Sequence, residues 1–209
     1  MKDLFWIFIF FIIILYFFGE GKLSDNVDYE STSIDSLSDT FSIQQEKFVK
    51  YPFDYVVVKS LGETEEHRLV LACQYITDYF GCDCFIQSGE NIGEEMKIEN
   101  TDDILDCDTT LQLLWQNHRN SQYRTIFITD KLLWSKGQRL RGMTYYGESV
   151  ILVCASDDFL RETILHEMGH TLNLKHCQDS TCIMSVNNDE WDSGDFCKNC
   201  KNYLLQIWN

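Results

Sequence analysis

The most informative part of this sequence is the run from His166 to His176, which contains three of the five histidines in the chain. His166 and His170 are four residues apart, so on a helix both imidazoles lie on one face and can bind the same ion. Glu167 follows the first of them and completes the pattern HExxH. In this pattern zinc polarises a bound water, and the glutamate accepts a proton from it during attack on a peptide carbonyl. The segment therefore predicts a zinc-dependent hydrolytic site with Glu167 as general base.

A third ligand is needed, because catalytic zinc usually keeps three protein ligands and one open position for water. His176 is the candidate, six residues beyond His170. To reach the ion, the helix must end and the chain must turn back, and Asn173 suits this turn because asparagine tolerates the left-handed conformation. The alternative is an ordinary amphipathic helix with surface histidines, which the third histidine disfavours. We assign no role to His67 and His118.

Four of the nine cysteines stand in two close pairs directly after the third histidine: Cys177, Cys182, Cys197 and Cys200. This spacing suits a tetrahedral zinc site with four thiolates, which is structural because no position remains for water. Two disulfides or four free thiols are the alternatives, and an oxidising compartment would favour disulfides.

The remaining five cysteines lack this paired spacing: Cys73, Cys82, Cys84, Cys107 and Cys154. Cys73 and Cys154 fit buried core positions. Cys82 and Cys84 form a C-x-C pattern, which we interpret as local packing in preference to a metal site or a redox pair.

The elements that must position these residues follow from apolar periodicity and turn residues. Strands are predicted at 54–58, at 84–86, at Tyr123–Thr129 and at Val150–Cys154. Helices are predicted from a cap at Thr64 to a stop at Gly81, and around 104–115. A final helix over 157–172 has Ser156 as its expected N-cap and acidic residues at its positive end, and it presents the histidine pair.

The run HEMGHTLNLKHC, followed by C-x-M and then C-x-x-C, resembles the archaemetzincins, a family of zinc metallopeptidases in the metzincin clan. The likeness is strong over 164–200, fainter over 123–156 and nearly absent upstream. It implies that the three histidines ligate a catalytic zinc, that Glu167 is the base, and that Met184 is the Met-turn residue beneath the metal. It implies likewise that the four paired cysteines hold a second, structural zinc. This sequence departs from the family in having Asn173 where glycine is usual.

Together these observations predict an α/β fold: a metzincin-like (zincin) domain with a mixed sheet, an active-site helix and a small C-terminal subdomain around the four-cysteine zinc. Residues 51–209 would form this metallopeptidase domain. Residues 143–146 are expected as the edge strand above the cleft, on which an extended peptide would pair. The expected activity is peptide-bond hydrolysis, with two zinc ions as cofactors, and the resemblance suggests aminopeptidase action. The alternative is a non-catalytic, zinc-stabilised binding module tethered to a membrane, although a purely structural site has no need of Glu167.

The N-terminal part of the sequence has a different composition. Leu4 to Phe18 is an unbroken run of fifteen apolar residues, which suits either a single-pass membrane anchor or a signal peptide, so 1–21 is assigned to that segment. Residues 22–50 are expected to form an acidic, flexible linker. A membrane-anchored protein and a protein secreted after signal cleavage both remain open. The formal net charge of −16 argues against a nucleic-acid partner, and we expect a monomer that acts on a peptide or protein.

Overall fold

The computed structural model describes residues 51–155, 158–185 and 194–208. Its strands are β1 (Tyr55–Leu61), β2 (Asp83–Glu90), β3 (Ile104–Asp106), β4 (Tyr123–Thr129), β5 (Leu132–Ser135), β6 (Gln138–Leu140), β7 (Gly142–Thr144) and β8 (Val150–Cys154). Its helices are α2 (Glu66–Phe80), α3 (Cys107–His118), α4 (Leu160–Thr171) and α5 (Lys198–Trp208), with a short 3-10 helix η1 (Glu94–Met96). Within the described ranges, none of the helices has the length and apolar character that a membrane span requires. Leu4 to Phe18 and the expected linker at 22–50 lie outside the described residues.

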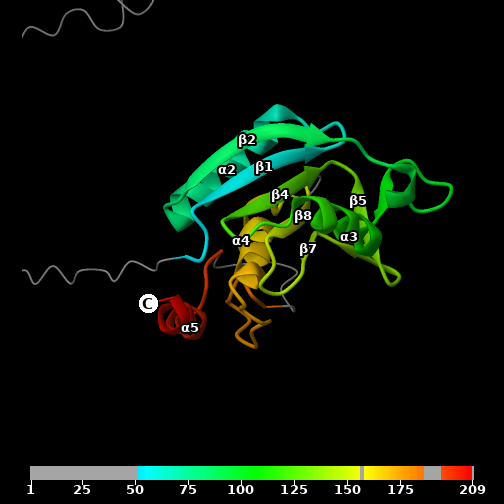
Figure 1. Cartoon of the computed structure of the whole chain (residues 1–209). Coiled ribbons are helices and arrows are strands. Elements are labelled where there is room, and N and C mark those ends of the chain that lie inside the picture. Colours follow the sequence, from blue (N-terminus) through cyan, green and yellow to red (C-terminus); the bar gives the residue numbers. More distant parts are fainter. Residues whose placement is uncertain (1–50, 156–157, 186–193, 209) are drawn as a thin grey trace, which may run out of the picture. The chain divides into compact units, whose positions relative to one another are not determined.

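The main sheet has five strands in the order β2-β1-β4-β8-β7 (Figure 1). β1 is parallel to β2 and β4, and β4 is parallel to β8, whereas β7 pairs antiparallel with β8. The predicted mixed sheet is therefore confirmed. A smaller sheet has the strand order β3-β5-β6; β3 directly precedes α3 in the chain, and β5 and β6 lie between β4 and β7.

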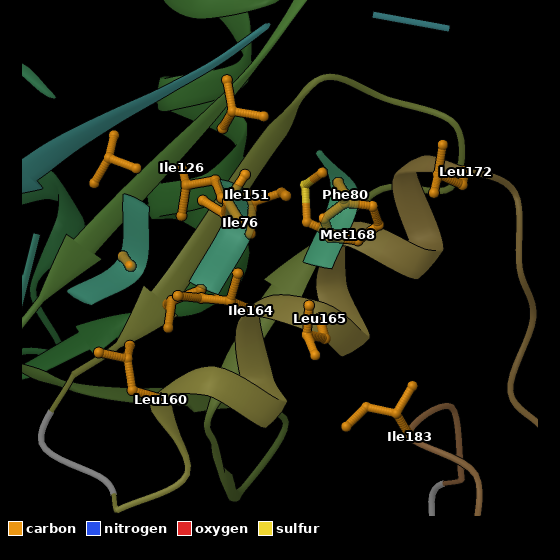
Figure 2. Packing of buried hydrophobic residues seen from close by; sticks show 14 of the residues in the cluster. Ile76, Phe80, Ile126, Ile151, Leu160, Ile164, Leu165, Met168, Leu172 and Ile183 are labelled. Carbon is orange, nitrogen blue, oxygen red and sulfur yellow. The ribbon is translucent and has the colours of Figure 1, made fainter. Parts of the chain in front are cut away.

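Both faces of the central strands β4 and β8 are buried, and alternate residues of each of these strands serve different cores. In β4, Ile126 and Ile128 belong to the core shared with α2 and α4, whereas Phe127 belongs to the core shared with α3. Figure 2 shows Ile164, Leu165 and Met168 of α4 in the first of these cores. Burial on two faces explains why the strands read as continuous apolar runs, as is typical of parallel sheets.

Several boundaries differ from those expected. Residues 104–106 form the strand β3, and α3 begins only at Cys107, where the Asp106 carboxylate accepts a hydrogen bond from the Thr109 amide at 2.8 Å. The Thr64 hydroxyl does not cap α2, because it donates to the Ile128 carbonyl at 3.0 Å. The predicted stop of α2 at Gly81 is confirmed by its φ of 64°.

The later elements also differ in part. α4 begins at Leu160, and the expected cap at Ser156 lies outside the described residues. The edge strand expected at 143–146 is β7, which ends at Thr144 and leaves Tyr145 and Tyr146 in the following loop. The C-terminal helix α5 was not predicted.

The interpretation of Cys73 and Cys84 as separate packing residues was wrong. The structure joins them in a disulfide that links α2 to β2. Cys154 is fully buried, as predicted, and Cys82 remains a free thiol. A C-x-C pattern gives no indication that one member bonds to a cysteine eleven residues earlier in the chain.

Candidate active site and metal centres

The HExxH residues lie in α4. His166 and His170 lie on one face of this helix, as their spacing predicts. The Nε2 atoms of His166 and His170 are 3.1 Å apart, close to the separation of about 3.3 Å that two tetrahedral zinc ligands at 2.0 to 2.1 Å would have. Each Nδ1 lies against a backbone carbonyl, that of Ile183 at 2.7 Å for His166 and that of Leu174 at 2.8 Å for His170. A carbonyl oxygen only accepts, so Nδ1 bears the proton and Nε2 keeps its lone pair for a metal.

The helix ends in the turn that the third histidine requires. Asn173 has a φ of 65°, so the predicted left-handed turn is confirmed. The Leu174 amide donates to the Gly169 carbonyl and the Asn173 amide to the His170 carbonyl, each at 3.0 Å. This pair of bonds is the Schellman motif, which reverses the chain after a helix.

The reversal brings His176 back to the histidine pair. Its ring centroid lies 5.4 Å from that of His166 and 4.8 Å from that of His170. One ring nitrogen from each of the three residues lies within 4.8 Å of the others. Burial lowers the pKa of all three imidazoles, to about 4 for His166. They are therefore neutral at physiological pH, which is the form that binds a metal.

Glu167 is the buried acid beside this group and is 6% exposed. Burial raises its pKa to about 8, whereas a cation held by the neighbouring imidazoles would favour the carboxylate and oppose that shift. Its side chain packs beside Gly142 of β7, where an added Cβ would lie 2.9 Å from the Glu167 Cγ. The glycine thus leaves room for the glutamate between α4 and the edge strand.

Met184 packs directly beneath α4. It is fully buried, and a Cβ at Gly169 would lie 2.4 Å from its sulfur. The Met184 carbonyl also accepts a hydrogen bond from the Cys177 amide at 2.9 Å. The small residue at 169 is therefore required by this contact, which sequence alone did not indicate.

The four paired cysteines form a second cluster, with sulfur atoms that all lie within 4.8 Å of one another. The sulfurs of Cys177 and Cys197 are 3.8 Å apart, and those of Cys182 and Cys200 are 3.7 Å apart. Four thiolates around zinc at about 2.3 Å would have separations of about 3.8 Å. A disulfide requires about 2.05 Å, and all four cysteines are free. The donor set and its dimensions fit a tetrahedral zinc.

The two clusters share short stretches of chain. His176 is followed directly by Cys177, and Cys182 directly precedes Ile183, whose carbonyl orients His166. The Ile183 amide in turn donates to the Asp195 carbonyl at 2.8 Å, and the Tyr79 hydroxyl of α2 donates to the Asp195 carboxylate. The contacts of Ile183 and Asp195 are long-range, and no sequence pattern indicated them.

A loop after β7 also borders the histidines. The Gly147 amide donates to the His170 carbonyl at 3.0 Å, and the Asn173 side chain fills the space that a Cβ at Gly147 would occupy. Tyr146 remains 54% exposed, with its ring edge-on to His170 at 4.8 Å between centroids. Asn173 in place of the usual glycine is thus accommodated by a glycine in the facing loop.

Comparisons with known proteins agree on one family. Residues 150–206 match the model of Peptidase family M54. An archaemetzincin from Saccharolobus solfataricus is 44% identical over 48 residues, which are 21% of this chain and 26% of the relative. One from Natronomonas pharaonis is 35% identical over 52 residues, 23% of this chain and 30% of the relative. The chain thus covers less than a third of the length of these curated relatives.

Solved structures extend the likeness to the fold. The crystal structure of archaemetzincin from Methanopyrus kandleri superposes with a TM-score of 0.61 at 16% identity, over 74% of this chain and 95% of the other. The crystal structure of archaemetzincin from Archaeoglobus fulgidus, complexed with malonate, superposes with a TM-score of 0.58 at 19% identity, over 71% of this chain and 98% of the other. The fold is therefore of the α/β metzincin-like class. Within that class, the resemblance to the archaemetzincin family is confirmed, by sequence in the C-terminal part and by fold over most of the described residues.

Proposed function

We propose that this chain is a zinc-dependent metallopeptidase, with a catalytic zinc held by His166, His170 and His176. The observation that supports this most strongly is the convergence of three neutral imidazoles beside a buried carboxylate. Two of the imidazoles are already oriented by carbonyl acceptors, so little reorganisation would accompany metal binding. A site that serves folding alone has no need of the acid at 167.

Glu167 would act as the general base and then as the general acid. Zinc, when bound, supplies a water of lowered pKa and polarises the scissile carbonyl. The Glu167 carboxylate would accept a proton from the attacking water and later donate it to the leaving amine, so no covalent intermediate would be required. Burial, which raises the pKa of Glu167 to about 8, opposes the attraction of the metal and keeps the acid and base forms both accessible near neutral pH.

We further propose that the four cysteines hold a second zinc with a structural role. The positions of its ligands in the chain suggest what this zinc contributes, because Cys177 adjoins His176 and Cys182 adjoins Ile183. Fixing Cys177 limits the freedom of His176, and fixing Cys182 limits that of Ile183, the carbonyl partner of His166. Met184, in the same segment, would be the Met-turn residue that supports α4.

The substrate is proposed to be a peptide that lies extended along β7. This strand pairs with β8 on one side, and no strand of the described residues pairs with its other side, so that edge could form main-chain hydrogen bonds with a peptide. Glu167 lies beneath it at Gly142. Matched peptides with free and acetylated N-termini distinguish aminopeptidase action, which the family resemblance suggests, from internal cleavage.

The N-terminal segment is proposed to direct the domain to a membrane or secretory route. Leu4 to Phe18 supports this by its composition. The Cys73–Cys84 disulfide adds an independent argument, because disulfides persist in oxidising compartments. Extraction of cell membranes at alkaline pH separates the two forms: an anchored chain stays in the membrane fraction, and a cleaved chain is released.

Glu167→Gln in the purified full chain tests the catalytic proposal, with zinc content and peptide cleavage measured together. The variant should retain zinc and lose a factor of about 10² to 10⁴ in turnover, as expected for loss of a general base. Glu162→Gln on the same helix is the matched control, and it should retain both properties. Unchanged cleavage in Glu167→Gln would refute the assigned role, and an inactive wild-type chain with full zinc would support a non-catalytic module.

A further inference from the structure

The edge of the main sheet opposite to β7 is formed by β2 (Figure 1). β2 pairs with β1 on one side, and no strand of the described residues pairs with its other side. Phe85 and Ile86, in its middle, are 50% and 44% exposed. The strand contains no lysine, arginine or proline, which are the residues that commonly protect an edge from further pairing. A register shift after Gln87 in the pairing with β1 marks a bulge near the end of β2, so the regular part of this open edge is 83–87.

Apolar surface lies on both faces of this edge. Cys84 and Ile86 lie on the same face of β2, and the disulfide between Cys84 and Cys73 links this face to α2. Val70, one helical turn before Cys73 in α2, is 50% exposed. On the opposite face, Phe85 lies edge-on to Tyr55 at 5.6 Å between ring centroids, and Tyr55 stacks on Tyr123 at 5.0 Å. An added strand could therefore pack its apolar side chains against either face of this edge.

The exposed apolar residues are concentrated at this edge. Six large hydrophobic side chains are exposed among the described residues, and Val70, Phe85 and Ile86 are three of them. The disulfide fixes the edge strand to the helix beneath it, so the surface is held in one conformation before any partner arrives. Such preorganisation lowers the entropic cost of binding.

We propose that the outer edge of β2 is a docking site for an extended segment of a partner protein, which joins the sheet as an additional strand and carries basic residues between its apolar ones. Charge supports this choice, because the chain has a formal net charge of −16 and Asp83, at the start of β2, is exposed, whereas Glu90 at its end already pairs with Lys59 at 3.2 Å. Backbone pairing would supply affinity, and alternate side chains would supply specificity.

Two other occupants fit this surface less well. Antiparallel pairing of two copies of β2 over its full length sets Asp83 opposite Glu90 and Phe85 opposite Ser88, which places like charges together and leaves the apolar residues without apolar partners. Residues 24–46 of the same chain contain six acidic residues and no lysine or arginine, so they would meet a surface of like charge.

The test uses a fluorescein-labelled peptide of alternating valine and lysine, with the same length as β2, titrated with the purified full chain and followed by fluorescence anisotropy. Binding is expected both in the wild type and in Glu167→Gln, with equal affinity, because β2 is remote from the proposed peptidase cleft. This equality separates the docking site from the cleft, so the two proposals fail independently. A peptide of valine and glutamate, and one with a central proline, should bind about tenfold more weakly or not at all.

The double substitution Phe85→Lys with Ile86→Lys should weaken binding about tenfold or more, while Tyr203→Lys, at a 42% exposed position on α5, leaves it unchanged. Zinc content and circular dichroism verify folding, and Ile86→Ser replaces the double variant if that variant unfolds. Any of three results would overturn the proposal: the wild type does not bind the peptide, the proline peptide binds equally well, or the substitutions in β2 do not change binding. Dimerisation that the lysines abolish would overturn it in favour of a second copy.

Discussion

Gly142 leaves no room for a larger side chain beside Glu167, and this makes Gly142→Ala a sensitive probe of the proposed active site. A Cβ at this position would lie 2.9 Å from both the Glu167 Cγ and the Thr163 Cγ2, and 3.1 Å from the Leu152 carbonyl oxygen. Carbon atoms in ordinary contact are about 3.5 to 4.0 Å apart, so the glutamate must move by about 0.6 Å or more. Overpacking of this kind costs about 1 to 3 kcal/mol of stability.

The expected effect on catalysis is larger than the effect on metal binding. A displacement of about 1 Å in a catalytic group costs about 10²-fold in rate, so we expect kcat to fall about 10- to 100-fold. The atoms nearest to an added Cβ at Gly142 belong to Glu167, Thr163 and Leu152 and not to the histidines, so zinc content should be unchanged. Peptide-cleavage kinetics, zinc analysis and thermal unfolding of the purified full chain measure the three quantities.

Gly137→Ala is the matched control. Gly137, unlike Gly142, has a positive φ, of 82°, and an added Cβ there meets nothing within 4 Å. It should lose about 1 to 3 kcal/mol of stability through backbone strain and keep normal kcat. The reasoning would be refuted if Gly142→Ala retained full kcat, or if it lost zinc in proportion to activity.

Three further predictions follow from the same geometry. Cys182→Ser should lower the zinc content from the proposed two ions per chain to fewer than one. The substitution disturbs the four-cysteine cluster and also the neighbouring Ile183, whose carbonyl contacts His166. Loss of a single zinc with normal peptide cleavage would contradict this coupling. Gly169→Val should destabilise the fold by about 1 to 3 kcal/mol in chemical unfolding through its clash with Met184, and unchanged stability would argue against the described packing. Because burial lowers the pKa of all three imidazoles, to about 4 for His166, protons compete with zinc at the histidine site only in acid. Chelator competition should therefore show that the zinc affinity of this site is constant from neutral pH down to about 6 and falls below about 5. A tenfold loss at the histidine site between pH 7.5 and 6.5 would count against it.

The parts of the site that were predictable from sequence depend on short-range geometry. His166 and His170 share a helix face by their spacing alone, and the turn at Asn173 follows from the conformation that asparagine tolerates. The four cysteines stand in pairs close enough to indicate one cluster. Each of these inferences uses residues a few positions apart, where helix and turn geometry constrain the distance.

The features that were missed depend on contacts between distant segments. The carbonyl of Ile183 reaches His166 across seventeen residues, and Gly142 leaves room for Glu167 from another element altogether. The strand at 104–106 differs from the predicted helix start because a short apolar run is compatible with both structures. The bond between Cys73 and Cys84 depends on how α2 packs against β2, which neither residue's neighbours reveal.

The central claim is that three imidazoles converge on one zinc with a coordination position left for water. Anomalous diffraction at the zinc absorption edge, from crystals of the purified full chain, tests it most directly. We expect one peak about 2.0 to 2.1 Å from a nitrogen of each of His166, His170 and His176, and a second about 2.3 Å from the four cysteine sulfurs. A metal bound without His176, or the absence of any peak at the histidines of zinc-loaded protein, would contradict the account.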